Sequence, residues 1–190
     1  MFILNIHGYM GDSSNTNYNV LCNINNDITV DSPQLDYNSQ SPISIFNMLK
    51  NKIILNNNFQ KLIVGTSLGG FFAVCLGAEL DIPVIVTNPC LLPFVYIPQL
   101  GDIPKQHEKQ YADLFGKYIY NIDKRYVSTI IGLQDTIINH AYTKQVLKNS
   151  RYYEIDGEHN NLDSVVLDKL FKDIIFNYFE NGKEDKYDCD

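Results

Sequence analysis

The serine in the segment GTSLGG, residues 65–70, lies in a setting that suits a covalent nucleophile. This segment fits the pattern G-x-S-x-G, with an apolar run before it and a helix-forming run after it. A serine on a sharp turn between a strand and a helix exposes its hydroxyl, and Gly65 and Gly69 remove side chains that would clash there. The pattern therefore predicts that Ser67 attacks an acyl carbonyl.

The base that such a serine needs is most simply a histidine, and the chain has 4 of them. His159 is the favoured candidate, because it follows the last expected strand and precedes the closing helix. We expect His140 to face solvent or to cap backbone at the start of a helix, and His107 to be exposed. His7 follows the first strand, where we expect it to orient a loop through side-chain hydrogen bonds.

A carboxylate must hold the base in the correct tautomer and stabilise its protonated form. Asp135 follows an expected strand and precedes His159, which gives the chain order serine, aspartate, histidine. The other interpretation of Asp135 is an N-cap for the helix that follows it. Asp123 and Asp156 are weaker alternatives, because one precedes its strand and the other ends it. The sequence thus favours a triad of Ser67, Asp135 and His159.

Two backbone N–H groups are expected to bind the oxyanion that forms during acyl transfer. The N–H of Leu68, next to the nucleophile, is one expected donor. The second is expected from the loop after the first strand, where Gly8 lets the chain approach the site and the N–H of Tyr9 is favoured. His7 and Gly8 are therefore expected to support this loop.

These side chains need a scaffold, and the chain alternates short apolar runs with amphipathic runs. Strands joined by helices imply parallel pairing, so the sequence predicts an α/β fold with a mostly parallel sheet of about five to six strands flanked by helices. Residues 9–19 are expected to form a loop. The expected strands are residues 2–6, 28–30, 61–65, 82–87, 126–131 and 151–155, and the expected helices start near residue 41 or cover residues 68–80, 138–147 and 163–179.

One segment, at about residues 89–123, interrupts this alternation with several prolines and aromatic residues. We interpret it as a short cap inserted into a single domain of residues 1–180, which a polar tail at residues 181–190 follows. The aromatic residues of the cap either wall a small apolar acyl pocket or pack the cap onto the sheet. They are Phe94, Tyr96, Tyr111, Phe115, Tyr118 and Tyr120.

Composition argues against several other functions. The formal net charge of −7 disfavours nucleic acid or an anionic membrane as a partner, since both require clustered Lys and Arg. Neither the histidines nor the cysteines show a metal-ligand spacing, so we expect no metal and no cofactor. No apolar stretch approaches the roughly 20 residues that span a bilayer, and no basic region precedes the short apolar run at the N-terminus. A cytoplasmic location is expected.

With these motifs the chain resembles the α/β-hydrolase superfamily, and within it the small YqiA-like esterases. Besides the serine motif, the resemblance rests on IHGY at residues 6–9, VTNP at residues 86–89, GLQD at residues 132–135 and GEH at residues 157–159. It implies a compact sheet without the early antiparallel strands, a short cap, and cofactor-free hydrolysis of esters. The catalytic residues that it implies are Ser67, Asp135 and His159.

The expected reaction is ester hydrolysis through an acyl-enzyme intermediate, with small or medium acyl groups, because the cap is too short for a large lipase-type lid. One alternative is thioester or amide hydrolysis by the same three residues. Another is a binding protein that keeps the fold without the activity. The expected partner is a small-molecule acyl ester, and the sequence does not predict an oligomeric state.

Overall fold

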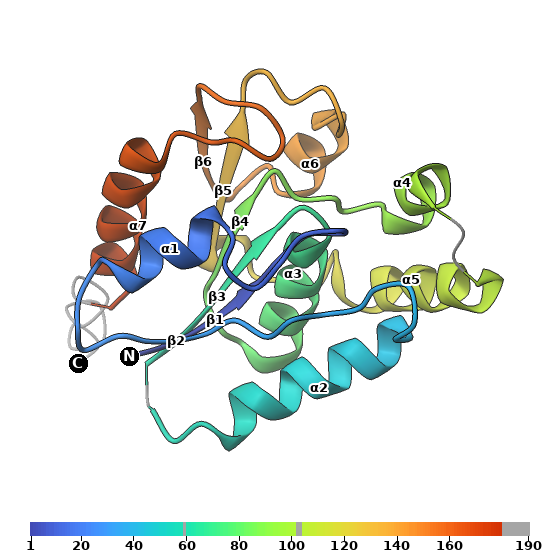
Figure 1. Cartoon of the computed structure of the whole chain (residues 1–190), viewed down its shortest axis with the longest axis horizontal. Helices are drawn as coiled ribbons and strands as arrows, with labels where there is room; N and C mark the ends of the chain where they lie inside the picture. The colour runs from blue at the N-terminus through green and yellow to red at the C-terminus, as the bar shows by residue number, and fades with distance from the viewer. Residues whose placement is uncertain (59, 102–103, 180–190) are drawn as a thin grey trace, which may run out of the picture.

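A six-stranded parallel sheet forms the centre of the protein (Figure 1). The computed structural model describes residues 1–58, 60–101 and 104–179. The strands are β1 (Phe2–Ile6), β2 (Thr29–Asp31), β3 (Lys61–Thr66), β4 (Val84–Thr87), β5 (Val127–Gly132) and β6 (Arg151–Ile155). They lie in the order β2-β1-β3-β4-β5-β6, and each neighbouring pair is parallel. The predicted α/β fold is therefore confirmed.

Helices cover both faces of this sheet. They are α1 (Thr16–Cys22), α2 (Pro42–Leu55), α3 (Leu68–Leu80), α4 (Pro93–Leu100), α5 (Lys105–Tyr118), α6 (Ala141–Val146) and α7 (Ser164–Phe179). The helices α1 and α7 lie together on one face, and α2, α3 and α5 lie on the other (Figure 1). Parallel strands joined through such helices give the layered arrangement that the alternating sequence predicts.

The hydrophobic core is therefore split into two layers, one on each side of the sheet. Neighbouring residues of β3 show the division, since Leu62 packs in the layer under α1 and α7 and Ile63 packs in the layer under α2 and α3. Helix α3 is apolar on all sides, and every residue from Leu68 to Gly77 is buried. A helix of this composition can only lie in the interior, and it fixes the turn that precedes it.

Because every strand of the sheet points the same way, the loops at the carboxyl ends of the strands meet at one edge. Ser67 directly follows β3, and Asp135 and His159 follow β5 and β6. The loop after β1 begins with His7 and reaches the same edge. Residues far apart in the sequence are thus brought together by strand direction alone.

Two helices differ from the sequence expectation. Residues 9–19 were expected to form a loop, but α1 begins at Thr16, where the Asn15 side chain accepts a hydrogen bond from the Tyr18 N–H. The helix is stabilised by tertiary packing of Val20 and Leu21, which its polar sequence does not reveal. Helix α6 is shorter than the expected 138–147, because the residues before it form a turn on the Asp135 side chain.

The segment between β4 and β5 folds into α4 and α5, and its aromatic residues pack against the body of the protein. The ring centroid of Tyr111 lies 5.8 Å from that of Phe71 on α3, and Tyr118 stacks on Phe46 of α2 at 5.1 Å. Phe94 of α4 meets Phe115 of α5 edge to face, with the ring centroids 5.3 Å apart.

The expectation that His107 is exposed is wrong, because the side chain is only 8% exposed. His107 lies one turn before Tyr111, and Leu114 and Tyr118 continue the same buried stripe of α5. This helical spacing of four, three and four residues places His107 on the inner face. The polar tail predicted at residues 181–190 lies outside the described residues.

Candidate active site

Ser67 occupies a strained turn between β3 and α3. Its backbone has φ 52° and ψ −118°, a conformation that is costly for a residue with a side chain. The turn is held by hydrogen bonds from the Ser67 N–H to the Thr87 carbonyl at 3.0 Å and from the Cys90 N–H to the Ser67 carbonyl at 2.9 Å. Neighbouring backbones touch here, since a Cβ at Gly69 would collide with the carbonyl of Ile6. This close contact explains the glycine after the serine in the motif.

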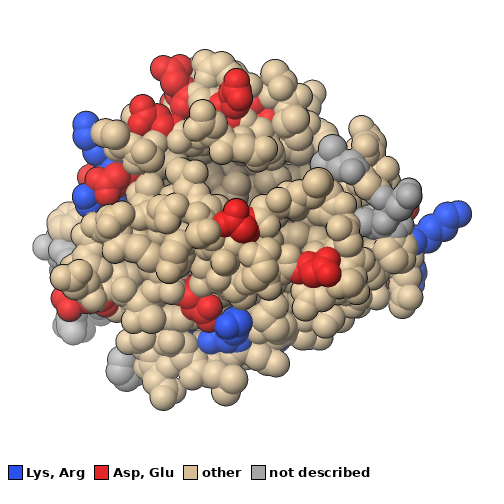
Figure 2. Space-filling model, in the orientation of Figure 1, with Lys and Arg blue, Asp and Glu red and all other residues tan. Residues whose placement is uncertain are grey.

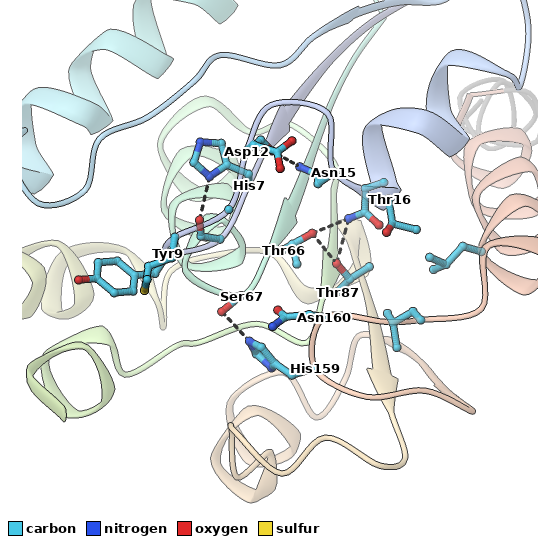
Figure 3. Close-up of a pocket in the computed structure, with 16 residues that line it drawn as sticks. His7, Tyr9, Asp12, Asn15, Thr16, Thr66, Ser67, Thr87, His159 and Asn160 are labelled. Atoms are coloured by element: carbon cyan, nitrogen blue, oxygen red, sulfur yellow. Dashed lines mark hydrogen bonds between the residues drawn. The ribbon is translucent and has the colours of Figure 1, made fainter. Parts of the chain in front are cut away.

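The side chain of Ser67 meets the histidine and the aspartate that the sequence favoured. The Ser67 Oγ lies 2.9 Å from His159 Nε2 (Figure 3). On the other side of the ring, His159 Nδ1 lies 2.7 Å from Asp135 Oδ2. Only 7% of His159 is exposed. Because the Asp135 carboxylate can only accept a hydrogen bond, the Nδ1 atom of His159 carries the proton. The lone pair of His159 Nε2 therefore faces the serine hydroxyl. This chain of contacts can remove a proton from Ser67 during nucleophilic attack.

The two interpretations of Asp135 describe different oxygens of one carboxylate. Its Oδ1 accepts from the Ile137 N–H at 2.9 Å and the Ile138 N–H at 3.1 Å, which is the capping contact. Its Oδ2 accepts from His159. Burial alone would raise the pKa of Asp135, but the hydrogen bonds from His140, His159 and the Ile138 N–H together hold it well below its usual range. The carboxylate therefore stays charged wherever the histidine must act as a base.

A second histidine contacts the same oxygen, which the sequence analysis did not anticipate. His140 Nε2 lies 2.7 Å from Asp135 Oδ2, and the side chain makes no capping hydrogen bond to α6, so the expectation that it faces solvent or caps backbone is wrong. The side chain is 7% exposed, and its Nδ1 has no hydrogen-bond partner among the described residues. His140 lies only five residues after Asp135, and the intervening turn folds back so that both histidines converge on one oxygen. Two N–H donors thus fix the carboxylate in one orientation.

Asn88 is a further residue that sequence reasoning missed. It is fully buried, and its backbone has φ 44°, a left-handed conformation that asparagine tolerates better than most residues. Its Oδ1 accepts from the Gly132 N–H at 2.7 Å, while its Nδ2 donates to the carbonyls of Glu158 at 3.2 Å and His159 at 3.0 Å. Asn88 therefore ties the end of β5, which leads to Asp135, to the loop that carries His159.

The loop after β1 passes directly beside the nucleophile. A Cβ added at Gly8 would lie 2.9 Å from the Ser67 Cβ. His7 holds the loop, since its Nδ1 donates to the Gly8 carbonyl at 2.8 Å and its Nε2 accepts from the Leu35 N–H at 2.9 Å. The N–H of Tyr9 has no acceptor among the described residues. Leu68 is the first residue of α3, where a backbone N–H has no partner within the helix.

Among the described residues neither of these N–H groups has an acceptor, so both are available to an oxyanion formed at Ser67. The ring of Tyr9 points away from Ser67, so only its backbone faces the site (Figure 3). The backbone of Cys90 is hydrogen-bonded to that of Ser67, but burial raises the pKa of the Cys90 thiol to about 12. It is therefore not a competing nucleophile.

A pocket of about 320 Å³ opens beside Ser67 and His159. Its walls come from the loop after β1, the start of α1, the ends of β3 and β4, and the loop after β6. One interpretation of the six aromatic residues of the inserted segment is that they wall an acyl pocket. None of them lines the pocket beside Ser67. The surface is hollowed near the middle of the face in Figure 2, and no Lys or Arg lies at that hollow.

Within the described residues, 1–58, 60–101 and 104–179, no helix is both long and apolar enough to span a bilayer. Within the same ranges there is also no cluster of three or more His, Cys, Asp or Glu side chains that could hold a metal ion.

The parallel sheet, its helical layers and the serine turn after β3 define an α/β-hydrolase fold. Solved structures with this architecture resemble the chain over most of its length at low identity. Est1E from Butyrivibrio proteoclasticus has a TM-score of 0.70 and 14% identity, covering 93% of this chain and 87% of that one. A monoacylglycerol lipase from Paleococcus ferrophilus has a TM-score of 0.68 and 12% identity, covering 93% and 94%.

Residues 2–159 match UPF0227, an uncharacterised protein family, and the chain belongs to this family. The UPF0227 protein YcfP of Escherichia coli is 31% identical to it over 104 residues. That match covers 53% of this chain and 54% of YcfP, so it spans about half the length of the curated relative. The α/β-hydrolase fold that the sequence motifs indicated is confirmed.

Proposed function

We propose that this protein is a serine hydrolase that cleaves carboxylic esters through an acyl-enzyme intermediate on Ser67. The observation that carries the proposal is the continuous contact from Ser67 Oγ through His159 to Asp135, at 2.9 and 2.7 Å. The fold is shared with Est1E from Butyrivibrio proteoclasticus and with a monoacylglycerol lipase from Paleococcus ferrophilus, and a lipase on this fold is consistent with the proposal. Small or medium acyl groups and a cofactor-free reaction are part of the proposal.

The first half of the reaction acylates the serine. Ser67 Oγ forms a bond to the ester carbonyl carbon while His159 Nε2 takes the hydroxyl proton. The N–H groups of Tyr9 and Leu68 stabilise the negative charge on the carbonyl oxygen. The bond between the carbon and the alcohol oxygen then breaks, and His159 gives its proton to the departing alcohol.

The second half releases the acid. A water molecule attacks the acyl-enzyme carbonyl while His159 takes one of its protons, and the same two N–H groups bind the new oxyanion. The bond to Ser67 Oγ then breaks, and His159 returns the proton to the serine. Asp135 keeps its charge throughout and stabilises protonated His159, which matches the lowered pKa of its carboxyl group.

The test is covalent labelling with a fluorophosphonate probe, which reacts only with an activated serine. We expect one label per chain, located on Ser67 by peptide mass spectrometry. The label should disappear in Ser67→Ala, while the exposed Ser164→Ala on α7 should label like wild type. Replacing Ser67 should also lower kcat for a short-chain ester by about a thousandfold or more. Folded wild-type protein that takes no label and hydrolyses no ester would contradict the proposal.

A further inference from the structure

Three hydrogen-bonded polar side chains line the pocket beside Ser67, and two of them, Thr66 and Thr87, are labelled in Figure 3. Asn17, from α1, is 3% exposed, and its Nδ2 donates to Thr66 Oγ1 at 2.7 Å and to Thr87 Oγ1 at 2.9 Å. The two threonine hydroxyls also contact each other at 2.9 Å. Neither the triad nor the oxyanion site uses this cluster, which we call the Asn17 floor.

The hydrogens in this cluster can be counted. Three contacts need three hydrogens, of which the Asn17 amide supplies two and one threonine hydroxyl supplies the third. If the amide were flipped, Asn17 Oδ1 would have to accept a hydrogen bond from both threonine hydroxyls. No hydrogen would then remain for the contact between the two hydroxyls. The amide orientation is therefore fixed by its partners.

Two hydrogen-bonding functions remain unused. Asn17 Oδ1 accepts no hydrogen bond from the described residues, and it is not sealed from solvent. The hydrogen of the second threonine hydroxyl likewise has no acceptor among those residues. The floor thus presents one acceptor and one donor side by side, which is the complement of a hydroxyl group on a ligand.

The other walls limit the charge of the ligand. Asp12 is the single Asp or Glu among the lining residues, and none of them is Lys or Arg. An anionic group would therefore have no counter-charge here and would face a carboxylate. An alkyl chain would cover the acceptor of Asn17 without giving it a partner, which carries the cost of a buried unsatisfied polar group. A neutral, hydroxylated group fits both conditions.

The size and place of the pocket indicate which part of the ester enters it. A volume of 320 Å³ holds about ten non-hydrogen atoms, taking roughly 30 Å³ for each as for liquid water. His159 and Asn160 form one wall. His159 must give its proton to the oxygen of the departing alcohol, so the alcohol lies against this wall.

We propose that the pocket binds the alcohol part of the substrate, and that this alcohol is a small uncharged polyol with a free hydroxyl on the Asn17 floor. The inference rests on the proposed esterase activity and specifies the substrate class of the same site. It makes Asn17 a residue that determines specificity, since it contacts the alcohol and not the reacting carbonyl.

The test compares two esters of one acid, glyceryl monobutyrate and propyl butyrate, which differ only in two hydroxyl groups. We expect wild type to favour the glyceryl ester by about tenfold or more in kcat/KM, since one or two neutral hydrogen bonds separate the substrates. Asn17→Leu should bring the ratio close to one, mainly by lowering kcat/KM for the glyceryl ester. Asn19→Leu, an exposed change on the same helix, should keep the wild-type ratio. If Asn17→Leu does not fold, Thr66→Val should reduce the ratio in the same direction.

The outcomes separate this inference from the proposed function. Fluorophosphonate labelling of Ser67 together with equal kcat/KM for the two esters would overturn the polyol pocket and leave the esterase proposal standing. A ratio that survives in Asn17→Leu would also overturn it. A preference for propyl 3-hydroxybutyrate over propyl butyrate, without a preference for glycerol, would place the hydroxyl on the acyl side and refute the assignment. No labelling and no ester hydrolysis would refute both proposals.

Discussion

Replacing Asn88 tests whether the active site depends on the link between the acid and the base. The side chain makes three hydrogen bonds to backbone groups, at 2.7, 3.0 and 3.2 Å, and the first two are buried. Each of these hydrogen bonds contributes about 1 kcal/mol, so Asn88→Gly should lower the free energy of unfolding by roughly 3 kcal/mol. Asn88→Ala should cost about 1 kcal/mol more, because alanine disfavours the φ of 44° that glycine accepts freely.

The catalytic effect should be larger than the effect on substrate binding. Without Asn88 the loop that carries His159 is no longer tied to the end of β5, and a shift of about 1 Å can cost about a hundredfold in rate. We therefore expect kcat and the rate of fluorophosphonate labelling to fall by about ten- to a hundredfold. KM should change little, because Asn88 does not line the pocket.

The assays are denaturant unfolding, steady-state kinetics and the labelling rate. Asp81→Gly is the matched control, because Asp81 is exposed, has φ 54° and lies at the far end of α3 from Ser67. It should leave kcat unchanged. An Asn88→Gly variant with wild-type kcat and labelling rate would refute the reasoning, even if its stability were reduced, because the residue would then support the fold without positioning His159.

Two more predictions concern the shared carboxylate oxygen. His140→Leu removes one of the two donors to Asp135 Oδ2, so the carboxylate is held less firmly against His159 and kcat should fall by about tenfold. His140→Gln, which can still donate, should lie closer to wild type. Equal kcat values for the two variants would argue against a role for the hydrogen bond. The pKa of Asp135 is lower in the folded chain than in the unfolded one, so its contribution to stability is complete above about pH 4 and is lost as the pH falls below that value. Acid titration of the unfolding free energy should therefore show a steeper decline for wild type than for Asp135→Asn, and identical slopes would contradict the cause assigned to the shift.

Local sequence signals were sufficient for the sheet and for the residues of the triad. The apolar runs are long enough to specify strands, and the glycines around Ser67 reflect contacts within the turn itself. The placement of Asp135 and His159 required only chain order and strand direction, since parallel strands end at the same edge. The roles of these residues in catalysis stay predictions that the labelling and kinetic experiments test.

Asn88, His140 and the Asn17 floor could not be predicted in the same way, because their roles depend on contacts between distant segments. Asn88 reaches residues 44 and 71 positions later, and Asn17 reaches Thr87 across 70 positions. A polar side chain carries no periodic signal that reveals such partners. His107 is different, since its helical spacing with Tyr111, Leu114 and Tyr118 was present in the sequence and indicated burial.

The assembly of the site from separate strand ends also ties the proposed reactivity of Ser67 to complete folding. Ser67 and His159 are 92 positions apart, and their contact requires β3, β5 and β6 to be in register. Such distant contacts form late, after local helices and collapse. During refolding, labelling of Ser67 should lag behind the recovery of helical circular dichroism. On the proposed mechanism, a chain that is still incomplete, as during synthesis before residue 159 emerges, would carry the serine without its base.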